Sequence, residues 1–409
     1  MMALMQNVIT LCSSMILFQA LLQPSICFQL AKKLTNLPLI PAHTRSTTER
    51  RIHHGKFLHN ALGFESFEEK SSPSSKSSVV VRELQSQFEI EEVDLVFRVA
   101  FGTFLNIDPP STVFGNREFK RHGYTEWWAA FDDNNLLLGS VCASQWGSVG
   151  VIGPLTVRPD TWDQGVGKAL LKKALEHFDE SLDQLSIKKV VLSTFPGSPK
   201  HLALYWKHGF QPKNLLSFMQ KNLTTTTNYS SNAALLEGYT VHSLNREDDI
   251  SLLLQEAAEF SSQTVFQGMD LQPEIQRVKE LSLGDTIILR KSDPSKPENL
   301  ATHGNICGLA VCHWGPGSEA DTGEMYIRFA AARDADAFAA LLAAAEAGAR
   351  GLGLHALCGG VNLGRVDAFK IMMNANFGIV SNHLSMERDA ETNVGSWDTP
   401  HHFVIDEWW

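Results

Sequence analysis

Two glycines separated by one residue, Gly165 and Gly167, mark the segment of this 409-residue chain that is best suited to chemistry. They follow an apolar run that ends at Leu155-Thr156-Val157, and they precede an apolar stripe at helical spacing: Leu170, Leu171, Ala174, Leu175 and Phe178. The pattern predicts a buried strand, a glycine turn and an amphipathic helix. Glycines let backbone N–H groups approach a ligand closely, and a helix N-terminus attracts negative charge. The segment therefore predicts a binding site for phosphate groups.

The spacing of these residues excludes two common nucleotide motifs. A phosphate loop for nucleoside triphosphates requires a glycine five positions before Gly167 and a hydroxyl residue after Lys168, but Trp162 and Ala169 stand there. A dinucleotide-binding fingerprint requires a third glycine where Leu170 stands. The phosphate groups therefore belong to another kind of ligand.

A second candidate for chemistry is Tyr205, which lies in the segment from Ser198 to Phe210. Leu202, Tyr205 and Trp206 fall at helical spacing, and Gly209 is well placed to end a helix in a left-handed conformation. A tyrosine on such a helix is either a core aromatic residue or a proton donor. Its spacing alone leaves both roles open.

The elements that must position these residues follow the order of a mixed α/β fold. Asp132-Asp133-Asn134-Asn135 predicts a hairpin turn, because these residues tolerate positive φ. A helix is expected over 89–104, and the glycine turn and Tyr205 each introduce another helix. Strands are expected at 79–81, 127–131, 136–146, 149–157, 189–193 and 216–221.

A second body of similar length follows a polar linker that runs from Thr224 to Asn232. The sequence around Val141-Cys142 and Trp146-Gly147 is echoed by Val311-Cys312-His313-Trp314-Gly315, and Asn376-Phe377-Gly378 falls where Gly209-Phe210 would repeat. These echoes predict an internal duplication.

The second copy lacks the chemical features of the first. Its equivalent strand, Met325 to Ala330, has no glycine turn after it, and Asp334 and Asp336 would repel phosphates. Met372 stands five residues before Phe377, where the first copy has a tyrosine. We therefore expect four segments: a leader and joint at 1–78, a first domain at 79–223, a linker at 224–237 and a degenerate second domain at 238–409.

The charge of the chain is unevenly distributed. The formal net charge is −10, and residues 1–64 hold six basic residues and one acidic residue, a net +5, so the remaining residues carry −15. An acidic body argues against a nucleic-acid partner, which requires a basic face. It suits a cationic amine, because net charge influences the encounter with a substrate.

The N-terminal segment has the composition of a targeting leader. Val8 to Leu22 is apolar but too short and too polar-interrupted to span a membrane, and Pro24-Ser25-Ile26-Cys27 offers small residues for cleavage. Phe28 to Phe64 is basic and hydroxyl-rich, as transit peptides are, and Ser71 to Ser78 is a serine-rich joint. A signal-like stretch followed by a transit-like stretch predicts import into a plastid; the alternative is a cytoplasmic protein with a disordered extension.

The six cysteines do not form the pattern of a disulfide framework, a metal site or a nucleophile. Cys12 and Cys27 lie in the leader. The other four lie on apolar strand-like runs and are expected to be small buried side chains: Cys142, Cys307, Cys312 and Cys358. No metal is expected.

The segments at 155–171 and 198–210 resemble motifs A and B of the GNAT superfamily of acyl-CoA N-acyltransferases. In motif A a Leu-x-Val-x-Pro strand leads to Gly-x-Gly and a helix, and in motif B a helix carries a tyrosine and ends at Gly-Phe. Residues 79–409 are similar to tandem-domain GNAT proteins that pair an intact N-terminal lobe with a degenerate C-terminal lobe. The resemblance implies an α/β fold of two GNAT-like domains, each a central mixed sheet flanked by helices.

The resemblance also implies a ligand and roles for its neighbours. Acetyl-CoA would donate the acyl group, with its pyrophosphate on the amides of Gln164 to Ala169 and its thioester carbonyl polarised by a backbone N–H near Val157. Tyr205 would protonate the departing thiolate. The residues expected to bind the acyl donor are Leu155, Thr156, Val157, Gln164, Gly165, Val166, Gly167, Lys168, Ala169 and Ser198.

Two carboxylates are candidates for the base that deprotonates the acceptor amine. Glu126 precedes two tryptophans on the second strand, where a solvated strand carboxylate is the alternative role, and Glu319 lies on a Gly-Pro-Gly loop of the second lobe. The sequence thus predicts an N-acetyltransferase that acts on a primary amine of a small molecule or a peptide. The alternatives are a non-catalytic acyl-CoA sensor and a structural scaffold.

Overall fold

The computed structural model describes residues 78–108, 110–112, 125–180, 187–224, 234–247, 249–292, 306–389 and 399–406. The predicted leader therefore lies outside the described residues. Residues 78–409 form one compact unit. In the described part of this unit, no helix has the length and apolar character needed to cross a bilayer, and no group of three or more His, Cys, Asp or Glu side chains could hold a metal ion.

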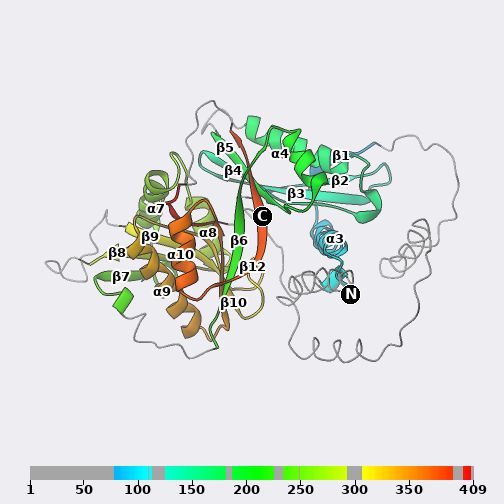
Figure 1. Ribbon diagram of the computed structural model, residues 1–409. Coiled ribbons are helices and arrows are strands. Elements are labelled where there is room, and N and C mark those ends of the chain that lie inside the picture. Colours follow the sequence, from blue (N-terminus) through cyan, green and yellow to red (C-terminus); the bar gives the residue numbers. More distant parts are fainter. Residues whose placement is uncertain are drawn as a thin grey trace, which may run out of the picture. The chain divides into compact units, whose positions relative to one another are not determined.

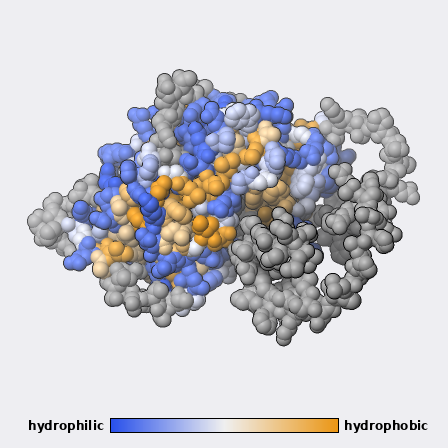
Figure 2. Space-filling model, in the orientation of Figure 1, coloured by the Kyte–Doolittle hydropathy of each residue, from blue (hydrophilic) through white to orange (hydrophobic). Residues whose placement is uncertain are grey.

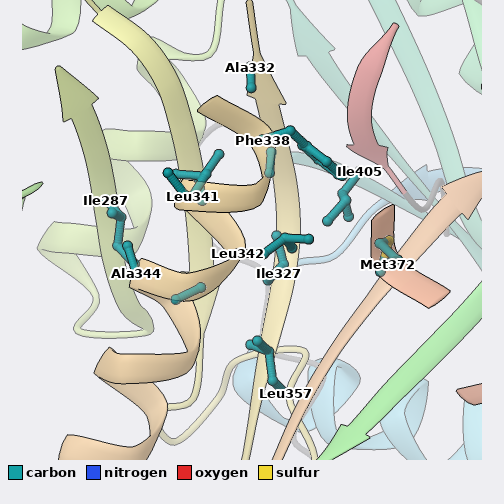
Figure 3. Close-up of a cluster of buried hydrophobic side chains, with 14 of the residues drawn as sticks. Ile287, Ile327, Ala332, Phe338, Leu341, Leu342, Ala344, Leu357, Met372 and Ile405 are labelled. Atoms are coloured by element: carbon teal, nitrogen blue, oxygen red, sulfur yellow. The ribbon is translucent and has the colours of Figure 1, made fainter. Parts of the chain in front are cut away.

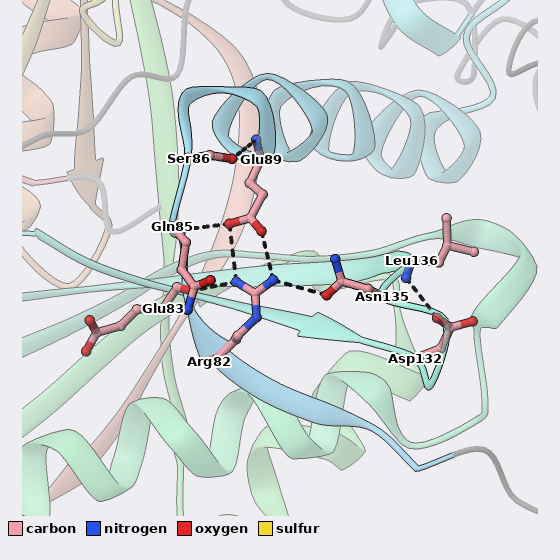
Figure 4. Close-up of polar contacts among 8 residues, drawn as sticks. All are labelled: Arg82, Glu83, Gln85, Ser86, Glu89, Asp132, Asn135 and Leu136. Atoms are coloured by element: carbon pink, nitrogen blue, oxygen red, sulfur yellow. Dashed lines mark hydrogen bonds and ion pairs between the residues drawn. The ribbon is translucent and has the colours of Figure 1, made fainter.

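The unit begins with a strand and a helix that are joined by an ion pair. Strand β1 (Val80–Glu83) leads into α3 (Gln87–Leu105). The Ser86 hydroxyl caps α3 by accepting a hydrogen bond from the Glu89 N–H at 3.2 Å, and Arg82 donates to the Glu89 carboxylate at 2.7 Å (Figure 4). The Arg82 guanidinium lowers the pKa of Glu89. The start of α3 is thereby fixed to the edge of the sheet.

The predicted hairpin turn is confirmed by its backbone geometry. The Asp132 carboxylate accepts a hydrogen bond from the Asn134 N–H at 2.9 Å. It accepts a second from the Leu136 N–H at 2.8 Å (Figure 4). Asn135 has a φ of 61°, a left-handed conformation. The turn joins the second and third strands of the first half, whose further elements are β2 (Thr125–Phe131), β3 (Leu137–Trp146), β4 (Val149–Val157), α4 (Val166–Glu180), β5 (Lys189–Thr194), α5 (Pro199–Trp206) and β6 (Gln211–Asn222).

The second half repeats this order with an additional helix and an additional strand. Its elements are β7 (Tyr239–Ser243), α7 (Ser251–Thr264), α8 (Gln272–Glu280), β8 (Gly284–Lys291), β9 (Ile306–His313), β10 (Glu324–Ala332), α9 (Ala335–Gly351), β11 (Ala356–Asn362), α10 (Val366–Asn374), β12 (Gly378–Asp389) and β13 (Phe403–Asp406). Short 3₁₀ helices lie at Pro110–Thr112, Pro159–Thr161 and Leu244–Arg246.

All strands of the described residues belong to one sheet, in the order β1-β2-β3-β4-β5-β12-β6-β11-β10-β9-β8-β7, with β13 paired to β10. In the first half β2, β3 and β4 are antiparallel and β5 is parallel to β4. In the second half β8, β9 and β10 are antiparallel and β11 is parallel to β10. The same mixed-sheet topology therefore occurs twice, and the predicted α/β fold of two similar halves is confirmed.

At the centre of the sheet the two halves exchange one strand each. The second-half strand β12 pairs with β5 and β6, which are both in the first half. The first-half strand β6 pairs with β12 and β11, which are both in the second half. Figure 1 shows β6 and β12 side by side between the two lobes. Each half is therefore completed by a strand that the other half supplies.

Buried ion pairs link the exchanged strands β12 and β6 to their neighbours. The Lys189 ammonium on β5 lies 2.6 Å from the carboxylates of both Glu387 and Asp389 on β12. Lys221 on β6 lies 2.6 Å from Glu346 on α9. Burial alone would lower the pKa of Lys189, but the two carboxylates outweigh burial and raise it. Lys189 therefore stays cationic inside the sheet.

Helices cover both faces of the sheet and create three main cores. In the first half, α4 packs its Leu170 over Trp128 of β2 on one face, and α3 covers the other face (Figure 1). In the second half, α9 buries Phe338 and Leu341 against the sheet and against α10 (Figure 3). Helices α7 and α8 pack with Trp146 of the first half, so that the third core joins the two halves.

The exchanged strands leave some apolar surface in the middle of one face of the molecule (Figure 2). Large apolar side chains that are exposed on β6, β12 and α10 are Leu215, Ile379, Val366 and Met373. The cysteines at 142, 307, 312 and 358 are buried and lie outside any disulfide of the described residues, as the sequence predicts.

Candidate active site

The parallel strands β4 and β5 pair over a short stretch and then diverge. Their pairing joins Val149–Val151 to Lys189–Val191. Beyond it lies a cavity of about 710 Å³, lined by residues 152–157 of β4, the end of β5, the glycine turn and α5. Because β4 is not paired with β5 along this stretch, backbone N–H and C=O groups on that edge can hydrogen-bond a polar ligand.

The glycine turn opens onto this cavity. Gly165 has a φ of 89°, and a Cβ placed there would meet nothing within 4 Å. Glycine is therefore favoured at this position by the left-handed backbone conformation and not by a lack of room for a side chain. Helix α4 begins at Val166, and residues 165–168 line the cavity. The first N–H groups of a helix have no partner within it. These N–H groups make the turn suited to binding an anion, the role that the sequence predicts for it.

The loop before the turn is fixed by side chains. The Trp162 indole N–H donates a hydrogen bond to the Val157 carbonyl at 2.8 Å. Lys200 of α5 lies 2.8 Å from Asp163, and its ammonium is 5.5 Å from the centre of the Trp162 ring. Lys168 and Lys200 line the cavity, together with Lys207, and provide positive charge for phosphate groups.

Helix α5 places Tyr205 in the cavity wall. The Ser198 hydroxyl caps the helix by accepting a hydrogen bond from the His201 N–H at 3.5 Å, and Gly209, with a φ of 87°, follows its end. The Tyr205 ring is buried, and its centroid lies 6.0 Å from that of Phe210 in a T-shaped contact. Burial raises the pKa of Tyr205 to about 12. The hydroxyl therefore keeps its proton at neutral pH and can donate it.

Most of the residues predicted to bind the acyl donor are brought together. The cavity is lined by Leu155, Thr156, Val157, Gly165, Val166, Gly167, Lys168 and Ser198. Gln164 and Ala169 are not among the lining residues. The Gln164 side chain donates to the Asp160 carbonyl at 3.2 Å, and the Ala169 N–H donates to the Gly165 carbonyl at 3.1 Å. These two residues shape the turn without lining the cavity.

Neither carboxylate predicted as a base lines the cavity. Glu126 lies on β2, where alternation places its side chain on the same face as Trp128, the face covered by α4. Glu319 is buried in the second half, with its carboxylate 3.1 Å from Arg328. The structure therefore places both groups away from the site that holds Tyr205.

Comparison with protein families matches the segment that forms this site. The model of the acetyltransferase (GNAT) family matches residues 90–210, which include the divergent strands, the glycine turn and Tyr205. Residues 90–210 thus match a GNAT acetyltransferase domain. Proteins of this family use acetyl-CoA. A comparison with curated proteins finds no match to the chain.

Solved structures share the fold of the GNAT domain and of the second half. A candidate acetyltransferase from Pyrococcus horikoshii is 13% identical, with a TM-score of 0.52 over 84% of this chain and 99% of that one. A GCN5-related N-acetyltransferase from Sphaerobacter thermophilus is 13% identical, with a TM-score of 0.50 over 78% of this chain and 98% of that one. The glucosamine N-acetyltransferase region of a fungal multi-domain β-N-acetylglucosaminidase is 15% identical, with a TM-score of 0.54 over 79% of this chain and 39% of that one.

One end of the cavity carries an aromatic group that no sequence pattern indicated. The Phe195 ring, just after β5, lies 4.7 Å from the ring of Phe104 and 6.0 Å from that of Phe101, both on α3. Two imidazoles join this group: His201 lies 5.1 Å from Phe104, and His383 of β12 lies 5.6 Å from Phe195. All five line the cavity. Helical periodicity could have paired the two α3 rings, but no pattern links His383 to them.

In the second half, the helix N-terminus that corresponds to the glycine turn is capped by a carboxylate. Helix α9, which corresponds to α4, is capped by Asp334, whose carboxylate accepts a hydrogen bond from the Ala337 N–H at 2.8 Å. A carboxylate thus occupies the helix end where the first half offers free amides. Met372, at the position of Tyr205, is fully buried in the core around α9.

The C-terminal strand fills the cleft of the second half. Strands β10 and β11 pair from Glu324 to Ile327, and β13 then pairs with β10 from Phe329 to Ala332. Arg365, at the start of α10, lies 2.7 Å from the Asp406 carboxylate, and both groups are buried. The backbone edge that is open in the first half is therefore closed here by the chain itself.

Proposed function

We propose that the first half transfers an acyl group, in the simplest case acetyl, from acyl-CoA to a primary amine. The observation that carries this proposal is the position of Tyr205, a buried and protonated hydroxyl in the wall of a cavity that also receives the N-terminus of α4. The glycine turn would bind the pyrophosphate, and the open edge of β4 would bind the amides and the thioester carbonyl of the donor.

The second half would not bind a second donor. Its helix end is capped by Asp334 and its cleft contains β13, so each chain has one acyl-CoA site. This half serves instead to complete the first, through β12.

The acceptor is proposed to be an amine carried on an apolar or aromatic group. The end of the cavity next to α3 is lined by Phe101, Phe104 and Phe195. Aromatic faces attract ammonium groups and pack against apolar carriers.

A panel of amines tests the proposed function. The full chain is incubated with acetyl-CoA and with aliphatic amines, aromatic amines and a lysine-containing peptide, and the released thiol and the acetylated product are measured. Thiol release that depends on at least one amine is expected. Binding of acetyl-CoA without thiol release would favour the sensor, and absence of binding would favour the scaffold.

A charge placed in the glycine turn tests the binding site. Gly167→Asp adds a carboxylate to the first turn of α4, where it stabilises a helix but repels phosphate. The matched control Gly351→Asp adds the same charge at the end of α9, where a Cβ meets nothing within 4 Å. Calorimetry should show loss of acetyl-CoA binding in the first variant and unchanged binding in the second.

A further inference from the structure

The cavity connects the two faces of the sheet. Val190 and Leu192 of β5 belong to the core under α4, which also contains Tyr205. Phe195, beyond the end of the same strand, contacts the two phenylalanines of α3 on the opposite face. Tyr205, the proposed proton donor, therefore packs on one side of the divergent strands and Phe195 on the other, with His201 of α5 between them in the cavity wall.

The exchanged strand β12 brings His383 to the face of α3. Leu384 pairs with Thr194 of β5 and packs with the core under α4. Side chains alternate along a strand, so His383 points to the other face. Its ring makes a T-shaped contact with Phe195, at 5.6 Å between centroids, and lines the cavity while being only 6% exposed. The register of β12 against β5 thus fixes the imidazole beside the cleft.

Four side chains in the cavity wall are able to accept a proton: Asp163, His201, His208 and His383. The other titratable groups of the wall are Lys168, Lys200, Lys207 and Tyr205. Asp163 lies in the glycine-turn loop and is paired with Lys200, and His208 is 2.8 Å from the Leu204 carbonyl through Nδ1. Burial, and then the charge of Lys200, lowers the pKa of His201 and makes it a weaker base.

We propose that His383, which the second half supplies on its exchanged strand, accepts the proton of the acceptor ammonium. This inference rests on the proposed function and adds the residue that activates the nucleophile. An amine that enters over the rings of Phe101 and Phe104 reaches the thioester from the face of His383, and sulfur departs on the side of Tyr205. Imidazole is the side chain most often used for such a transfer near neutral pH.

The proton balance of the reaction requires both groups. His383 takes one proton from the ammonium, and the neutral nitrogen forms a bond to the thioester carbonyl carbon. The carbon–sulfur bond breaks, and Tyr205 gives its proton to sulfur. The second proton that nitrogen loses replaces the one given by Tyr205, and the proton on His383 passes to water. An ammonium and a thioester become an amide, a thiol and one free proton.

The test compares two amines in the full chain and in His383→Gln. One is an alkylamine that is protonated at the assay pH, and the other is a fluorinated analogue whose conjugate acid has a pKa below the assay pH. For the protonated amine, kcat/KM should fall by roughly a hundredfold or more, as for loss of a general base. For the fluorinated amine, which needs no deprotonation before attack, the fall should be less than about fivefold.

Controls separate this role from a structural one. His383→Asn, with a shorter amide, should show the same contrast between amines, and acetyl-CoA affinity by calorimetry should change little in both variants. The matched control His401→Gln, at an exposed histidine of the second half, should leave both rates unchanged. Equal losses with both amines, full activity of His383→Gln, or the same contrast in His201→Gln would overturn the proposal. A wild-type chain inactive with every amine would overturn the proposed function as well.

Discussion

At the scale of single residues, Tyr205 joins burial to a chemical task. Its ring packs against Phe210, so a variant that keeps the ring should keep the fold. Tyr205→Phe removes only the hydroxyl. We expect turnover to fall by about tenfold or more, because a proton donor acts in the transition state. Acetyl-CoA affinity and thermal stability, measured in parallel, should change little. If Tyr205→Phe were instead destabilised while its remaining folded molecules kept normal turnover, Tyr205 would be a structural residue.

The raised pKa of Tyr205 predicts how the rate depends on pH. Burial raises this pKa to about 12, so the protonated form, which donates, persists as the pH rises. The rate with a saturating amine should therefore show no alkaline decline between neutral pH and about 10, the pKa of an ordinary tyrosine. A decline in the wild-type rate with a midpoint below pH 10 that is absent from Tyr205→Phe would contradict the raised pKa of Tyr205.

At the scale of elements, the ion pairs of Lys189 hold β12 in register against β5. The Lys189 and Glu387 side chains are 2% and 4% exposed. Lys189→Met leaves the Glu387 carboxylate buried without its cation, and should lower the free energy of unfolding by about 3–5 kcal/mol. Because β12 carries His383, turnover should fall too. Urea unfolding and the amine assay measure the two effects.

Two further variants define the cause. Lys189→Met combined with Glu387→Leu should recover much of the lost stability, because no buried charge remains. Lys172→Met, which breaks the exposed pair with Glu176, should change stability by less than about 1 kcal/mol. If the single Lys189 variant, the double variant and the Lys172 variant were equally unstable, the buried ion pair would not be what stabilises the pairing of β12 with β5.

At the scale of the whole molecule, neither half is complete alone. Among the described residues, β6 pairs with second-half strands only, and β12 with first-half strands only. Residues 78–233 expressed alone would lack β12 and would expose the edge of β5, which invites aggregation. We expect this fragment to be insoluble or inactive, and co-expression with residues 234–409 to restore soluble protein and turnover. An active isolated fragment would show that the exchange is dispensable, and would also remove His383 from the mechanism.

The sequence by itself determined the parts of this protein that local patterns encode. Gly165 requires positive φ, the apolar stripe after it requires a helix, and Gly209 ends the helix of Tyr205; each follows from neighbours a few residues apart. The hairpin turn at Asp132 could be predicted for the same reason, and the duplication could be predicted because short motifs of the first half recur in the second. Most of the candidate acyl-CoA site could therefore be predicted.

Only the tertiary structure decided which strands are neighbours. Strand pairing joins backbone groups that every residue carries, so the exchange of β6 and β12 leaves no mark in local sequence. The exchange places His383 beside Phe195. Glu126, by contrast, lies on the face of β2 that α4 covers, and Glu319 is buried next to Arg328 in the second half, so neither lines the cavity. The same applies to β13, whose few apolar residues could pair with any open edge but close the cleft of the second half.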